Sequence, residues 1–125
     1  MQPDQLRAQL SHFTGSETFA HHALIPTVLM TEGVRYLADA AGAHWLTDAI
    51  ASYVLDDRTS QENFQVWHLA VDPRTRKAIL TMTDGNSSKP IITQEFDYTD
   101  FPLDEIDLWL VASGSTWVMM LPSEY

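Results

Sequence analysis

Histidines and carboxylates are the residues of this chain whose types could support metal chemistry. Neutral imidazoles and carboxylates are common ligands of zinc and related divalent ions. His44 and Asp48 stand four residues apart, a spacing that places two ligands together on a helix, and His21 or His22 could join them by folding over that helix. If Leu46 marks the buried direction of the helix, however, the pair points to solvent. A small metal-dependent hydrolase using these four residues is therefore an alternative, and our leading interpretation assigns no metal, no cofactor and no catalytic residue.

The segment from Glu95 to Asp107 combines carboxylates with aromatic rings. From Pro90 to Tyr125 there are seven acids and no Lys or Arg. Acids around exposed rings suit a basic protein partner, because the charges steer the encounter and the rings anchor the contact. The alternative is that Phe96 and Tyr98 belong to the core and the acids solvate the outer surface. The partner-binding residues that we predict are Asp97, Asp100, Phe101, Asp104, Glu105 and Asp107.

Composition excludes several classes of function. Seventeen acids against seven basic residues give a net charge of −10, which repels nucleic acids and anionic lipid heads. There is no cysteine, and the longest apolar runs span five residues, far short of the roughly 20 that a membrane helix needs. The start of the chain lacks the charged and apolar regions of a secretory signal, so we expect a cytoplasmic protein. No Gly-x-Ser-x-Gly elbow is present, which disfavours a serine hydrolase.

Helical spacing dominates the chain before Arg58. The pattern predicts a helix that begins at Pro3 and ends at Thr14-Gly15, a second that Thr31 caps and Gly42 ends, and a third over residues 43–54. The stretch between the first two helices, through His21-His22 to Pro26, is expected to cross the surface without regular structure.

Short β-rich runs dominate the chain after Arg58. They predict strands at Phe64 to Val71, Ala78 to Thr83, Ile91 to Tyr98, Ile106 to Ala112 and Thr116 to Leu121. Short connections favour pairing in sequence order. We therefore expect a single α+β domain over residues 1–125, with three N-terminal helices packed on a five-stranded antiparallel meander.

The order of these elements resembles that of cone-shaped folds, which hold small apolar ligands or support dimers. Trp67, Trp109 and Trp117 are large enough to line such a pocket, although rings of this size are more often plain core. A cone-like small-ligand binder is thus a further alternative, and a homodimer stays open.

Five segments carry a resemblance to a known family: Phe13 to Glu17, Thr31 to Leu37, Trp45 to Ile50, Phe64 to Trp67, and Leu121 to Tyr125. In these segments the chain resembles a family of small proteins of unknown function from bacteria, plasmids and phages. The resemblance covers most of the chain, implies a mobile-element setting and brings no activity with it. Our leading interpretation is a non-enzymatic interaction or regulatory protein that binds a basic protein surface. It would act as a phage or plasmid accessory factor, of anti-defence type, on host machinery.

Overall fold

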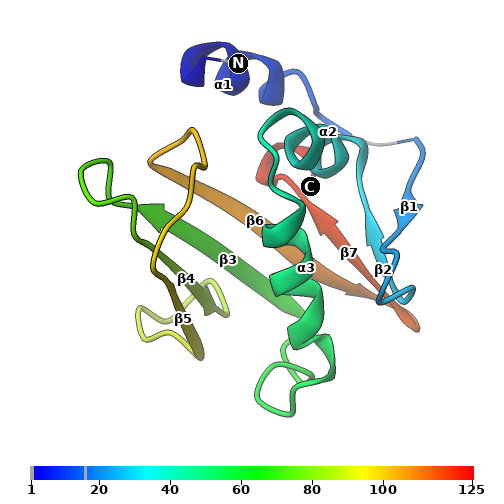
Figure 1. Ribbon diagram of the computed structural model, residues 1–125. Helices are drawn as coiled ribbons and strands as arrows, with labels where there is room; N and C mark the ends of the chain where they lie inside the picture. Colours follow the sequence, from blue (N-terminus) through cyan, green and yellow to red (C-terminus); the bar gives the residue numbers. More distant parts are fainter. Residues whose placement is uncertain (1, 16) are drawn as a thin grey trace.

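A mixed sheet with helices on one of its faces forms the body of the protein (Figure 1). The computed structural model describes residues 2–15 and 17–125. The strands in this part of the chain are β1 (Ala20–His21), β2 (Val28–Met30), β3 (Phe64–Val71), β4 (Ala78–Thr83), β5 (Ile92–Phe96), β6 (Glu105–Ser113) and β7 (Thr116–Met120). The helices are α1 (Pro3–Leu10), α2 (Glu32–Ala40) and α3 (His44–Ser52), with short 3-10 turns η1 (Tyr53–Leu55) and η2 (Pro122–Glu124). The predicted α+β class is confirmed.

The predicted five-stranded meander is wrong. The sheet has seven strands in the order β1-β2-β7-β6-β3-β4-β5, antiparallel throughout except that β2 and β7 run parallel. After β5 the chain returns to the middle of the sheet, where β6 pairs with β3, so that β6-β3-β4-β5 form a Greek key. This order places the two longest strands side by side at the centre, where both can bury their apolar faces, and leaves the shorter β5 at an edge.

The prediction that all three helices precede the sheet is also wrong. The stretch that we expected to be irregular contains β1 and β2, and β2 joins the sheet by pairing with β7, the last strand of the chain. Strands of two and three residues are too short to show an alternating pattern in sequence. The first helix, moreover, packs mainly against α2 and lies above it, away from the centre of the sheet (Figure 1).

The predicted ends of the second and third helices are close to those observed because the signals are local, whereas the first helix ends at Leu10, before the predicted Thr14-Gly15. Thr31 caps α2, with its Oγ1 accepting a hydrogen bond from the backbone N–H of Val34 at 3.3 Å. Gly42 follows α2 with a φ of 60°, the left-handed conformation that favours glycine at the end of a helix. Within α3, Leu46 and Ile50 are fully buried, as the helical spacing predicted.

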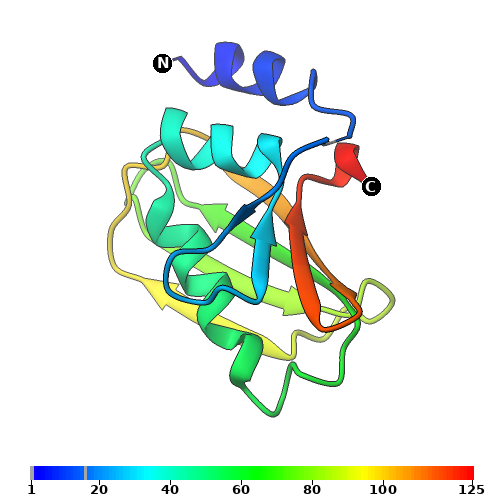
Figure 2. The ribbon, with the colours of Figure 1, turned by 90° about the vertical axis from the view of Figure 1, so that its right-hand side faces the viewer.

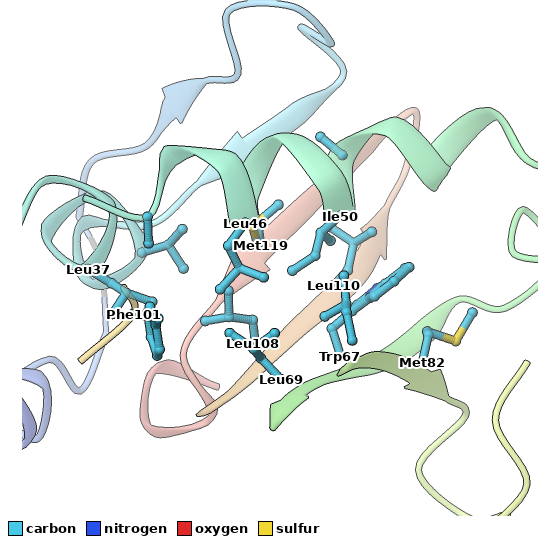
Figure 3. Packing of buried hydrophobic residues seen from close by; sticks show 14 of the residues in the cluster. Leu37, Leu46, Ile50, Trp67, Leu69, Met82, Phe101, Leu108, Leu110 and Met119 are labelled. Atoms are coloured by element: carbon cyan, nitrogen blue, oxygen red, sulfur yellow. The ribbon is translucent and has the colours of Figure 1, made fainter. Parts of the chain in front are cut away.

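Buried apolar side chains fill the space between the helices and the sheet. Figure 3 shows Leu46 and Ile50 of α3 above Trp67, Leu108 and Leu110 of the central strands. The Trp67 indole N–H donates to Gln65 Oε1 at 2.9 Å, so the polar atom of this fully buried ring has a partner. Along the described residues, no helix is both long and apolar enough to span a bilayer.

Candidate functional site

His22 fastens the β1–β2 hairpin to α3. Its side chain is 4% exposed, and its Nε2 lies 2.7 Å from Asp48 Oδ1. The backbone N–H groups of Leu24 and Ile25 both donate to Nδ1 at 3.1 Å. Because Nδ1 is an acceptor, the ring proton sits on Nε2 and is donated to Asp48. Both ring nitrogens are therefore occupied, and neither can bind a metal or move a proton while the hairpin stays in place.

The other histidines of the metal alternative lie elsewhere. His21 Nδ1 donates to the backbone carbonyl of Pro26 at 2.8 Å, and His44 Nε2 lies 2.9 Å from Asp39 Oδ1 on the exposed side of the molecule. Of the four residues of that alternative, the structure brings together His22 and Asp48. In residues 2–15 and 17–125, no three His, Asp or Glu side chains are arranged to hold a metal ion.

The three tryptophans of the cone alternative do not line a common cavity. Trp67 points from β3 into the core and Trp117 packs against the same core from β7. Trp109 is on β6 between Leu108 and Leu110, both buried, and so points to the opposite face of the sheet.

That opposite face, which we call the open face, carries no helix over its central strands (Figure 2). Alternation along each strand sends one set of side chains to it, and the strand register orders most of them in four rows across the sheet, with His21 of β1 next to Leu29 and the pair Ser113-Thr116 beyond the last row. In order from one end of the strands to the other, the rows are Glu95-Ile79-Ala70-Glu105, Thr93-Thr81-His68-Asp107, Thr83-Val66-Trp109-Met120 and Phe64-Val111-Val118-Leu29. The first two rows form an acidic half, and the last two form an apolar half.

An aromatic cluster lies at the apolar half of the open face. The ring of Trp109 is 5.0 Å from that of Phe64 and 5.4 Å from that of Tyr125, with each pair in an edge-to-face arrangement. The Tyr125 side chain stays 75% exposed. The sequence analysis did not predict that Phe64 and Tyr125 would lie at the surface of the sheet. The signal was present for Phe64, because the inward positions Trp67 and Leu69 require that Phe64 and Val66 face the other side.

Glu124 holds the end of the chain against the start of α2. Its Oε1 accepts from Thr31 Oγ1 at 2.6 Å and from the backbone N–H of Leu121 at 3.0 Å, and its Oε2 accepts from the backbone N–H of Gly33 at 3.2 Å. A carboxylate at this position is favoured by the N-terminal dipole of the helix. These contacts fix the backbone that carries Tyr125 to the open face.

His68 stands between two carboxylates in the acidic half. Its Nδ1 lies 2.6 Å from Asp107 Oδ1, and its Nε2 lies 3.7 Å from Glu105 Oε2. All three side chains are more than a third exposed. The hydrogen bond orients the imidazole, but the surroundings are solvent and not a closed cleft, so the arrangement adds to the polar character of this half.

The predicted partner-binding residues do not all lie on one face. Glu105 and Asp107 belong to the open face, and Asp97 lines a surface hollow with Lys77 at the end of β5. Asp104 is exposed immediately before β6, whereas Asp100 lies on the helix side of β5, near α3. Phe101 has no exposed surface and packs in the core, so it is not available to a partner.

Arg76 reaches the acidic segment but does not neutralise it. Its guanidinium donates to the backbone carbonyls of Thr99 and Phe101. Among the described residues, no ion pair joins an arginine of the β3–β4 turn to one of the predicted carboxylates. Glu105 and Asp107 lie beside His68 instead, and within the described residues Asp97, Asp100 and Asp104 have no ion pair.

Shifted pKa values occur in two loops outside the open face. Hydrogen bonds from Arg58 lower the pKa of Asp56 to about 2, and those from the backbone N–H groups of Asn86 and Ser87 lower the pKa of Asp84. Both acids are partly exposed and complete local turns, with Asp56 also accepting from the backbone N–H of Arg58. These shifts report loop structure and do not mark a catalytic group.

A model of a family of unknown function, DUF6876, matches residues 4–125. The chain belongs to this family. Membership confirms the predicted family of unknown function and carries no activity, and the bacterial, plasmid or phage origin stays a prediction. No curated protein and no solved structure matches the chain significantly.

Segments that carried the family resemblance meet around the end of the chain. Ser123 Oγ donates to the carbonyl of Phe13 at 2.7 Å, Gly33 donates to Glu124, and the Phe64 ring lies 5.7 Å from that of Tyr125. Four of the five resembling segments therefore meet at one structural junction.

Proposed function

We propose that this protein is a non-enzymatic interaction protein that binds a basic protein partner through the open face of its sheet. The observation that carries the proposal is the division of an uncovered face into an apolar half with aromatic rings and an acidic half. A phage or plasmid accessory role on host machinery is the setting that we propose for it, and it follows from the family resemblance alone.

The chemistry of the two halves defines the partner. Apolar and aromatic side chains such as Trp109, Phe64 and Met120 are enriched at the cores of protein interfaces. Glu95, Glu105 and Asp107 at the other end would attract cations, and the net charge of −10 would steer a basic protein toward the whole molecule. The matching surface presents apolar side chains beside lysines or arginines.

A second copy of the chain is a poor occupant of the whole face. In a two-fold stack, an axis parallel to the strands would place acidic half on acidic half. An axis perpendicular to the strands, in the plane of the interface, would place carboxylates on apolar side chains. Both arrangements cost free energy, because they oppose like charges or bury unpaired ones. The face is thus better suited to a different protein than to itself.

The size of the face fits a specific interface. Four strands at a spacing of about 4.8 Å and four rows at about 6.8 Å span about 19 by 27 Å, or about 500 Å² of flat area. The relief of the side chains, the ring of Tyr125 and the rim acids Asp97 and Asp104 enlarge this area. The flat area alone is about 60% of the ~800 Å² that each partner buries in a standard complex.

Site-specific photocrosslinking tests the proposal. A benzophenone amino acid placed at Thr81, in the middle of the open face, should crosslink a protein in lysate of the source organism. The same probe at Leu55, which is 79% exposed next to α3, should not crosslink that protein. The crosslinked segment of the partner should contain Lys or Arg beside apolar residues.

Affinity measured with the purified partner completes the test. Changing Glu105 and Asp107 to Lys should weaken binding at least about tenfold, because close charge pairs at interfaces contribute 1.5 kcal/mol or more. Changing the exposed acids Asp4 and Asp57 to Lys alters the net charge equally and should have a much smaller effect. Equal crosslinking at both probe positions, or equal affinity of the two double variants, would refute the proposal.

A further inference from the structure

A second surface site lies where the end of β5 meets the start of α3. Trp45, Phe96, Tyr98, Thr99 and Asp100 line a pocket of about 320 Å³. This volume is near the lower end of the range for ligand pockets and suits a ligand the size of one side chain. The pocket lies on the helix side of the sheet and is separate from the open face.

Three aromatic residues and one carboxylate give the pocket its chemistry. The rings of Trp45 and Phe96 meet edge to face, with centroids 5.0 Å apart and planes at 64°. Tyr98 is 70% exposed, although a ring of this size usually stabilises a fold by being buried. Asp100 is exposed at the same pocket, and neither lysine nor arginine lines it.

Arg76 fixes the loop that forms one wall of the pocket. Its Nε donates to the Thr99 carbonyl at 3.0 Å, and its own carbonyl accepts from the Thr99 N–H at 2.8 Å. Inside the loop, Thr99 Oγ1 accepts from the N–H of Phe101 at 3.1 Å. The buried ring of Phe101 then packs edge to face on Trp45, with centroids 6.5 Å apart. The wall is therefore formed before any ligand binds, which lowers the entropic cost of binding.

We propose that this pocket binds an alkylammonium cation. The faces of aromatic rings attract cations, and ligands with quaternary ammonium groups are held by several rings around the charge. Asp100 supplies an opposite charge, and the same carboxylate disfavours anions. The cation could come from a lysine side chain of a protein, methylated or not, or from a small free molecule such as choline. This inference does not rest on the proposed function, because it concerns another surface and another test.

Choline and its uncharged isostere 3,3-dimethylbutanol are the probes that decide whether charge is recognised. Their binding is followed by the NMR signal of the Trp45 indole N–H and by the amide signals of Tyr98 and Asp100. Choline should shift these signals with a dissociation constant in the millimolar range, and the isostere should bind about tenfold more weakly. Equal binding of the two probes, or no shift with choline up to about 50 mM, would overturn the proposal.

Matched variants assign the binding to the pocket. Tyr98→Leu and Asp100→Asn change exposed side chains, so the fold should survive, and each should weaken choline binding several-fold. Tyr125→Leu and Asp107→Asn make the same chemical changes on the open face and should leave choline binding unaltered. If the two pairs of variants behave alike, the pocket is not the binding site.

Short peptides distinguish the two sources of the cation. A peptide with one trimethyllysine flanked by neutral residues is compared with the same peptide carrying unmodified lysine, and with free choline. Tighter binding of either peptide than of choline would assign the site to a protein side chain. Tighter binding of choline would assign it to a small molecule. A failed photocrosslink at Thr81 would remove the open-face proposal and leave this result unchanged.

Discussion

Gly33 is the position where a single methyl group should test the junction at the end of the chain. A Cβ atom built on Gly33 would lie 2.6 Å from Glu124 Oε1 and 2.6 Å from Leu121 Cδ1. Ordinary contacts of a Cβ atom begin near 3.4 Å, so Gly33→Ala must move the carboxylate by close to 1 Å. That displacement breaks or weakens the bonds from Gly33 and Thr31 to Glu124.

The expected loss follows from two opposing effects. Alanine in place of glycine inside a helix contributes up to about 1 kcal/mol of stability. Hydrogen bonds to a charged group contribute about 1.5 to 3 kcal/mol each, and overpacking costs about 1 to 3 kcal/mol. We therefore expect Gly33→Ala to lower the free energy of unfolding by about 2 kcal/mol, which corresponds to a fall in Tm of about 6 to 10 °C.

Urea unfolding followed by the fluorescence of the four tryptophans measures this loss. Gly15→Ala is the matched control, because a Cβ atom there would meet nothing within 4 Å. In the Glu124→Ala background the methyl group added at Gly33 meets the end of the Leu121 side chain alone, so Gly33→Ala should cost little there. The double-mutant cycle should therefore show a coupling of about 2 kcal/mol between the two positions. Wild-type stability of Gly33→Ala, or additive effects in the cycle, would refute the reasoning.

Three further predictions concern the polar contacts. His22→Ala should destabilise the fold by about 2 kcal/mol in urea unfolding, because it removes three hydrogen bonds of a buried ring, whereas Asp48→Asn, which keeps an acceptor oxygen, should cost less. Because the fold lowers the pKa of Asp56, ionised Asp56 stabilises the fold fully above pH 3.8, the ordinary pKa of the group, and this contribution is lost as the pH falls through about 2. Arg58→Gln should raise the pKa of Asp56 toward 3.8 in an NMR titration. Arg76→Lys replaces the planar guanidinium, which donates to the carbonyls of Thr99 and Phe101, with an ammonium group that cannot reproduce both hydrogen bonds. It should speed amide hydrogen exchange in the loop that lines the aromatic pocket and weaken choline binding there.

Local signals in the sequence predicted the helices and the five long strands well. Thr31 and Gly42 act on the adjacent backbone, so their effect does not depend on the rest of the fold. The alternation of Trp67 and Leu69 with outward residues likewise records which face of β3 is buried. The net charge and the acidic character of the last third of the chain were also fixed by composition.

The order of the strands was decided by tertiary structure. An alternating pattern says which side of a strand is buried, but not which neighbour supplies its backbone hydrogen bonds, so β6 could not be placed beside β3 from sequence. The three residues of β2 form a strand because β7 offers them partners, and they carry no period of their own.

Both proposed sites show the same difference between what composition determines and what tertiary structure determines. Composition determined that acids and rings are abundant near the end of the chain, and the fold distributed them. It buried Phe101, left Tyr98 at a pocket with Trp45, and set Asp107 opposite His68 on the open face. Side-chain chemistry is a property of each residue, whereas a surface is made by residues that the sheet brings together from distant parts of the chain. That is why the abundance of acids and rings could be predicted from the sequence and the surfaces that they form could not.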